Sequence, residues 1–185
     1  MCTPVGHTLA GYAASGGIDA AERSVMWKRA ALIIGLANLP DADFFFGVMM
    51  GNPNKYHHLW THSIGFVLLV GLTALIIARA MGHPAAWKTG LLAGGLVLTH
   101  LVTDLFTVDW SEPTGMQALW PLSRRFFIAP IRIFPDVVKA SSTQAFLGSL
   151  VCWHNARTLA IELGIFGPPV LWIWLRRRKQ SKKLK

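Results

Sequence analysis

Cysteine is nearly absent from this sequence, which contains only Cys2 and Cys152. Two cysteines at this separation form no spaced framework, so the sequence excludes a disulfide-stabilised scaffold and a zinc site built from cysteines. The opening residues, MCTPVGHTLAGYAASGG, also lack a basic region and a strong apolar stretch. We therefore expect no cleavable signal peptide, and insertion into a membrane would depend on internal apolar segments.

Acidic residues are scarce too: nine Asp and Glu stand against eighteen Lys and Arg, which gives a net charge of +9. Seven of the basic residues lie in the last ten positions, RRRKQSKKLK, directly after the apolar run PPVLWIWL. A basic cluster beside an apolar helix is typical of a segment held at the cytoplasmic membrane surface by anionic lipid. We therefore expect the lipid bilayer, and no nucleic acid, as a partner. We interpret 1–175 as one membrane-embedded domain and 176–185 as a basic cytoplasmic tail.

Long stretches without charge predict helices of membrane-spanning length. Apolar residues make up 52% of the chain, and the mean hydropathy is +0.41. Apolar runs bounded by Pro, Gly and charged residues predict five helical segments, at 7–16, 25–39, 59–80, 85–106 and 158–175. The third and fourth approach the ~20 residues that cross a bilayer. The expected fold class is an all-α integral membrane bundle with about four spans.

The segment 107–139 is rich in Trp, Pro and Arg and has no helical periodicity. Irregular segments of this length tend to be functional, and we expect this one to lie ordered at the membrane interface. The positive-inside rule places the basic tail in the cytoplasm. Counting back through the spans places 79–88 and 23–29 on the same side and the long loop outside. We expect a multi-pass protein of the bacterial inner membrane.

In this topology, seven residues with metal-ligand side chains fall at a similar depth on the outer side. They are His7, Asp41, Asp43, His58, His62, His100 and Asp104. Ionisable groups within a membrane are costly and usually functional. A buried aspartate needs a partner, and a metal ion shared with histidines supplies one. The pattern predicts a metal site on the outer side of the membrane.

The spacing of these residues supports the same interpretation. His100 and Asp104 are four residues apart, so on a helix they share a face, and His58 and His62 have the same relation. Imidazole with carboxylate is the ligand set of zinc, with manganese or iron as alternatives. His57 points about 100° away from His58 on a helix, and we interpret it as a bystander or as a donor to a ligand.

Each feature also has an ordinary explanation when it is taken alone. A His and an Asp four residues apart on a helix are common by chance. Asp41 follows Pro40 and could cap a helix, and the histidine pair 57–58 could lie at the membrane interface. The shared depth of the seven residues is what favours a site.

Five stretches, in this order, resemble the YdjM-like family of membrane-bound metal-dependent hydrolases: GHTLAGY, LPDADFFFG, HHLWTHS, THLVTDLFTVDW and QALWPLSRR. The resemblance covers about residues 4–125. That family is distantly similar to the bacterial zinc-dependent phospholipase C and single-strand nuclease group, whose all-helical members bind zinc through His, Asp, His and HxxxD. The resemblance implies as ligands His7, Asp41 or Asp43, His58 or His62, and His100 with Asp104, the last as a bridging carboxylate.

The chain departs from that group in its late ligands. The group has a second histidine followed four residues later by glutamate, whereas here Thr158 stands four residues after His154, and Glu162 stands eight after it. We therefore expect one or two ions and no third.

The resemblance implies a membrane-bound hydrolase that activates water with metal to cleave a phosphoester of a lipid or lipid-linked molecule. Whichever of Asp41 and Asp43 does not bind metal would orient water or act as general base. Arg124 and Arg125 would hold a phosphate or anchor to lipid head groups. The alternatives are a non-catalytic membrane protein with a structural metal, a haem protein and a transporter. The aspartates disfavour haem, and the lack of ligand residues in the cytoplasmic half disfavours transport.

Overall fold

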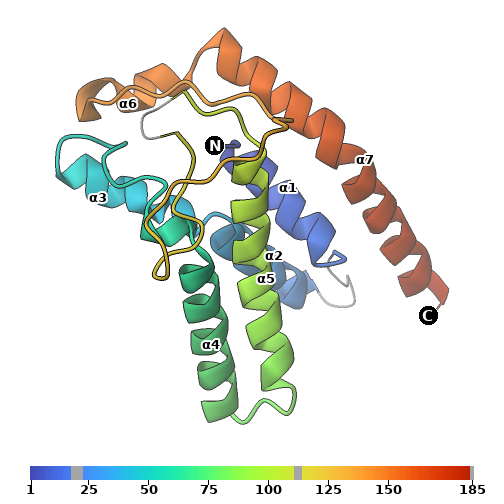
Figure 1. The fold of residues 1–185 in the computed structure, drawn as a ribbon. Coiled ribbons are helices and arrows are strands. Elements are labelled where there is room, and N and C mark those ends of the chain that lie inside the picture. Colours follow the sequence, from blue (N-terminus) through green and yellow to red (C-terminus); the bar gives the residue numbers. More distant parts are fainter. Residues whose placement is uncertain (18–22, 111–113, 184–185) are drawn as a thin grey trace.

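A computed structural model describes residues 1–17, 23–110 and 114–183 (Figure 1). The described residues form only helices, turns and irregular segments, which confirms the all-α prediction. The α-helices are α1 (Pro4–Ala14), α2 (Arg23–Ala37), α3 (Asp43–Met49), α4 (Ile64–Ala80), α5 (Ala86–Leu105), α6 (Thr143–Leu150) and α7 (Trp153–Lys183). Two short 3-10 helices, η1 (Pro40–Ala42) and η2 (Trp60–His62), precede α3 and α4.

Helices α4 and α5 form an antiparallel hairpin that projects away from the other helices (Figure 1). Helix α4 begins after Ser63, whose side chain accepts a hydrogen bond from the backbone N–H of Phe66. Glycines allow the two helices to approach closely, because a Cβ atom on Gly90 would lie 2.8 Å from the backbone oxygen of Gly71. The C-terminal end of α5 is buried among the other helices, and it includes His100 and Asp104.

Helix α1 lies between α5, α2 and α7. The residue that caps its N-terminus, Thr3, is held by α7: Glu162 accepts a hydrogen bond from the backbone N–H of Thr3 at 2.7 Å and another from the Thr3 hydroxyl. Gly6 makes room for this contact, because a Cβ atom there would lie 2.5 Å from a Glu162 oxygen. The contact between Thr3 and Glu162 holds α1 in an orientation in which His7, the residue after Gly6, contacts α5.

The loop 107–139 is tied to the segment that precedes α4. The backbone N–H of Gln117 donates to the oxygen of His58 at 3.0 Å, and Ile64 and Gly65 donate to oxygens of the loop. Isolated bridges join Thr107 to Phe134 and Met116 to Phe127. The described part of the loop therefore packs as ordered structure over the upper end of the hairpin, as its aromatic content predicts.

Fewer helices than expected have the length and apolar composition of a membrane span. Among the described residues, one helix qualifies, over 153–180. A second span results only if 26–37 and 40–49, bent by 65° at their junction, count as one broken span. Helix α4 is apolar but has 17 residues. The count of four spans therefore stays a prediction.

Several predicted boundaries were wrong. The third helix was expected from residue 59, but α4 starts at Ile64, because 59–63 form a 3-10 turn and a cap. Helices α3 and α6 were not predicted at all. Helix α7 starts at Trp153 and continues to Lys183, so the described part of the basic tail extends the last apolar helix instead of following it as a separate segment.

Candidate metal centre

All seven predicted ligands lie in one buried cluster, although they come from distant parts of the chain. Helix α1 contributes His7, the η1–α3 turn contributes two aspartates, and α5 contributes His100 and Asp104. The stretch before α4 contributes His58 and His62, and the buried ring of His57 lies beside them. The side chains of His7, His62 and His100 are fully buried.

Four of these side chains are spaced like the ligands of one ion, and we call Asp41, His62, His100 and Asp104 the ligand quartet. The Nε2 atoms of the two histidines lie 3.1 Å apart. Asp104 Oδ2 lies 3.2 Å from His100 Nε2 and 3.6 Å from His62 Nε2, and Asp41 Oδ1 lies 3.5 Å from each. Zinc bonds of about 2.0–2.1 Å in tetrahedral geometry separate neighbouring ligand atoms by about 3.3 Å. The quartet therefore matches the size of a first coordination shell.

Hydrogen bonds fix which nitrogen of each quartet histidine is available to a metal. His100 Nδ1 donates to the backbone oxygen of Ala37 at 2.8 Å, at the end of α2. His62 Nδ1 lies 3.0 Å from the Thr61 hydroxyl, whose hydrogen goes to Asp43 Oδ2 at 2.8 Å, so His62 Nδ1 is the donor. In its neutral form each ring thus presents the Nε2 lone pair to the quartet, as metal-binding histidines usually do.

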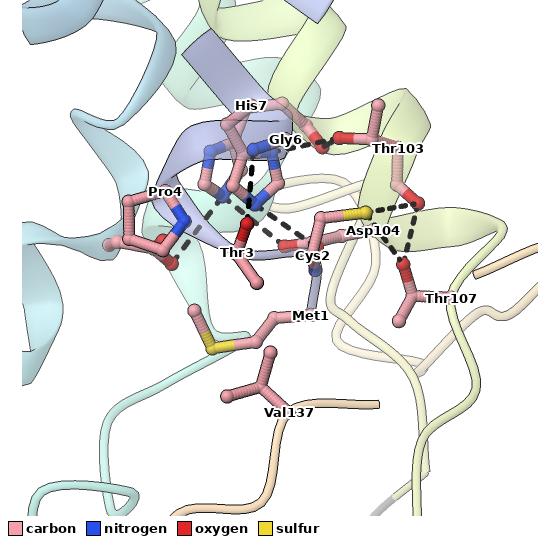
Figure 2. Close-up of polar contacts among 12 residues, drawn as sticks. Met1, Cys2, Thr3, Pro4, Gly6, His7, Thr103, Asp104, Thr107 and Val137 are labelled. Atoms are coloured by element: carbon pink, nitrogen blue, oxygen red, sulfur yellow. Dashed lines mark hydrogen bonds and ion pairs between the residues drawn. The ribbon is translucent and has the colours of Figure 1, made fainter. Parts of the chain in front are cut away.

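His7, from helix α1, contacts two members of the quartet, His100 and Asp104. Its ring stacks on His100 with centroids 3.6 Å apart, and its Nε2 lies 3.4 Å from Asp104 Oδ1. The Thr103 hydroxyl donates to the backbone oxygen of His100, so it accepts from His7 Nδ1 at 2.8 Å (Figure 2). The backbone N–H of Cys2 donates to Asp104 Oδ1 at 2.8 Å. One Asp104 oxygen is thus held by the N-terminal segment, while Oδ2 faces the quartet.

Polar atoms without a hydrogen-bond partner are concentrated in this cluster. Buried polar atoms almost always have a partner, because burying them without one costs free energy. Here the unpaired buried atoms include His7 Nε2, His57 Nε2, His58 Nε2, both oxygens of Asp41, and Asp104 Oδ2. Lone pairs and carboxylate oxygens that converge in this way are satisfied together by a cation, so the residues present fit a divalent metal.

His57 and His58 extend the cluster beyond the quartet. His58 adopts a left-handed backbone conformation with φ 65°, which is uncommon outside glycine. Its Nε2 lies 3.9 Å from Asp104 Oδ2, and its Nδ1 lies 3.5 Å from Asp109. Burial lowers the pKa of His58 to about 4, despite the nearby carboxylate of Asp109. Burial and the neighbouring His58 also hold the pKa of His57 well below its usual value. Both rings are therefore neutral near pH 7, the form that binds metal.

The assumption that His58 and His62 share a helical face was wrong, since 58–62 is not an α-helix. Both still face the cluster, together with His57. His57 Nδ1 lies 3.2 Å from Asp43 Oδ1, and its predicted role as a bystander or as a donor to a ligand stays a prediction. Its Nε2 has no hydrogen-bond partner and lies in the same group of possible metal ligands as His58.

Sequence reasoning missed the residues that support the cluster. Asp109, Thr61 and Thr103 contact cluster histidines, and Cys2 contacts Asp104. Asp109 stands within the stretch THLVTDLFTVDW, so a second carboxylate so close to the HxxxD pair was the available signal. The others act through tertiary contacts that no local pattern encodes.

The predicted phosphate-binding pair is not in the cluster. Arg124 and Arg125 are exposed on the loop, and within the described residues no hydrogen bond or ion pair links either guanidinium to the cluster. Their role stays a prediction. His83 is exposed at the far turn of the hairpin, and Glu162 is engaged by Thr3.

The sequence model of one protein family, described as YdjM inner membrane protein, matches residues 1–179. This match includes every cluster residue and extends well beyond the motifs at 4–125. No curated protein and no solved structure matches the chain. The family description names a location in the inner membrane and no reaction.

Proposed function

The chain belongs to the YdjM inner membrane protein family, and from this premise we propose that it is a metal-dependent hydrolase of the inner membrane. Its substrate is a phosphoester of a lipid or of a lipid-linked molecule. The observation that carries the proposal is the convergence of unpaired buried histidine nitrogens and carboxylate oxygens in the cluster. A purely structural core would leave few such atoms.

The ligand quartet would hold one ion, and the unpaired Nε2 atoms of His57 and His58 offer donors for a second ion beside it. Donors of this kind favour zinc, with manganese or iron as alternatives. A divalent ion bound there would polarise the ester and make a water molecule acidic enough to attack it.

Asp41 and Asp43 have different roles in the proposed site. Asp43 accepts a hydrogen bond from Thr61 and lies 3.2 Å from His57, so it positions histidines. Asp41 has two oxygens without hydrogen-bond partners and is slightly exposed, so it faces the metal and any entering water. Asp41 is therefore a ligand, and its second oxygen is placed to accept a proton.

An apolar pocket beside the cluster supports a lipid substrate. It has a volume of about 340 Å³ and is lined by Asp43, Phe46, Met50, Tyr56 and Trp60. Phe46 and Met50 are largely exposed, so the pocket is open from the outside of the fold. An amphiphile would place its chain against these side chains and its ester next to the metal.

We assign the cluster to the outer side of the membrane and the basic end of α7 to the cytoplasm. This orientation follows the distribution of basic residues, of which seven lie in the last ten positions. In it, the hairpin of α4 and α5 and the apolar part of α7 lie in the bilayer, and the loop 107–139 covers the cluster from outside.

A structural metal site is the second candidate. Closed structural zinc sites have four protein ligands, whereas catalytic sites keep a position open. Four ligands converge here, and three of them are almost completely buried. A bound metal without any hydrolytic activity would favour this alternative.

One experiment decides between the two candidates. The full chain, purified in detergent, is analysed for metal content and then assayed with lipid phosphoesters, soluble phosphoesters and carboxylic esters. We expect one or two ions of zinc, manganese or iron per chain, and phosphoester hydrolysis that a chelator stops and metal restores. Bound metal with no turnover of any ester would overturn the hydrolase, and absence of metal would overturn both candidates.

A further inference from the structure

We propose that the hairpin of α4 and α5 binds one anionic phospholipid, with an acyl chain along a groove between the helices and the phosphate at the hairpin turn. The hairpin turn, where the phosphate would bind, lies at the far end of the hairpin from the end of α5 that carries His100 and Asp104 (Figure 1). The proposed lipid site is independent of the proposed hydrolase activity.

The groove is apolar and long enough for part of an acyl chain. It has a volume of about 490 Å³, and its lining residues include Leu68, Leu72, Gly94 and Leu98. Its α4 wall runs from Val67 to Leu75, which corresponds to about 12 Å of helix. Close approach at Gly94, where an added Cβ atom would lie 3.5 Å from the Cα atom of Gly71, keeps the floor of the groove free of side chains.

A second pocket of about 390 Å³ continues the groove at the turn. Leu75 and Trp87 line both pockets, so the two are contiguous. The second pocket is also lined by Arg79 and His83. Lys88 lies nearby, with its ammonium nitrogen 5.5 Å from the centre of the Trp87 ring. An apolar groove that ends at cationic side chains has the shape and polarity of a lipid with an anionic head group.

The charge at this turn has no internal counterion. The sequence contains no Asp or Glu from residue 44 to residue 103, and no ion pair involves Arg79 or Lys88 among the described residues. A phosphate would therefore provide the complementary charge. In the orientation assigned above, the turn faces the cytoplasmic leaflet, whose anionic lipids bind basic pockets between helices.

The test measures lipid retained by the purified full chain, using native mass spectrometry with phosphatidylglycerol and phosphatidylcholine of identical acyl chains. Gly95→Leu fills the groove, because a Cβ atom at Gly95 meets no atom within 4 Å. Arg79→Gln removes the cation. The matched controls are Gly164→Leu, which also points into open space but on α7, and Lys28→Gln, an exposed cation on α2. Circular dichroism and metal content verify that each variant is folded.

We expect one retained phosphatidylglycerol per chain and weaker retention of phosphatidylcholine. Arg79→Gln should weaken phosphatidylglycerol binding about five-fold, the contribution of one basic residue near an anionic surface. Gly95→Leu should prevent retention of the lipid, and both controls should bind like the wild type. Equal retention of the two lipids, or an equal loss in Lys28→Gln, would overturn the proposal. If soluble glycerol phosphate, which has no acyl chain, displaces the lipid, then the groove does not contribute to binding and its proposed role is wrong.

Discussion

The Nε2 atoms of His62 and His100 face each other at 3.1 Å, while both rings are committed as donors through Nδ1. Two lone pairs repel at this distance, so a positive charge must lie between or beside them. Asp41 and Asp104 flank the same point, each within 3.6 Å of both nitrogens. A divalent cation satisfies all four groups at once, whereas a single proton satisfies two.

Loss of one quartet ligand should release the metal without unfolding the protein. His100→Ala and Asp104→Asn are expected to reduce metal content to background. The first removes a ligand nitrogen, and the second replaces a charged carboxylate by a neutral amide, which binds metal poorly. The control His83→Ala changes an exposed histidine at the hairpin turn and should retain metal. Elemental analysis of detergent-purified protein measures the effect, and circular dichroism verifies the fold. Unchanged metal in both quartet variants would show that the site is wrongly assigned.

The two aspartates of LPDAD should differ when they are changed to asparagine. Asp41→Asn removes a ligand with two unpaired oxygens, so metal binding should be lost. Asp43→Asn disturbs a residue that holds Thr61 and His57, and such supporting changes weaken metal binding about 10–100-fold. Competition with a chelator of known affinity measures both dissociation constants. Equal losses in the two variants would contradict the assigned roles.

The part of the site that follows from helical geometry was predictable from sequence. His100 and Asp104 are four residues apart in α5, and the structure places both at the centre of the cluster. The relation of His58 to His62 was misread, because a left-handed residue and a 3-10 turn bring both rings to the cluster without an α-helix. Local periodicity does not encode such a turn, which depends on the loop hydrogen bond from Gln117.

The supporting contacts and the short helices were not predictable for the same reason. The backbone oxygen of Ala37 and the backbone N–H of Cys2 act on α5 from 63 and 102 residues away in the sequence. Helix α3 has seven residues, too few for a clear apolar period. By contrast, the all-helical class was predictable because long apolar runs indicate helices. The convergence of the ligands was inferred from their shared depth in a four-span topology, and that topology stays a prediction.

The exposed arginines of the loop offer a test of substrate binding that leaves the metal untouched. Changing Arg124 and Arg125 to Gln should reduce turnover of an anionic ester while metal content stays at the wild-type level, because neither side chain contacts the cluster in the described structure. Arg132→Gln, an exposed arginine on the same loop, is the matched control. Initial rates over a range of substrate concentrations separate KM from kcat. If Arg132→Gln lowers turnover as much as the changes at Arg124 and Arg125, the pair does not bind the phosphate specifically and only attracts anionic substrates by its charge.

Two glycine substitutions should have opposite effects on stability. In Gly6→Ala the new Cβ atom would lie 2.5 Å from Glu162, in the contact that fastens α1 to α7. Overlap in a packed region costs about 1–3 kcal/mol. In Gly35→Ala the Cβ atom of α2 meets no atom within 4 Å, so the variant should gain up to about 1 kcal/mol from helix propensity.

Thermal unfolding in detergent measures this difference, and metal affinity adds a second readout. Displacement of α1 moves His7 and the Cys2 N–H donor away from Asp104, so Gly6→Ala should also bind metal more weakly than the wild type. Gly35→Ala should bind it normally. Thermal unfolding reports the loss of packing, whereas metal affinity reports the position of Asp104. If Gly6→Ala unfolds at a lower temperature than the wild type but retains full metal affinity, the N-terminal segment stabilises the fold without positioning Asp104.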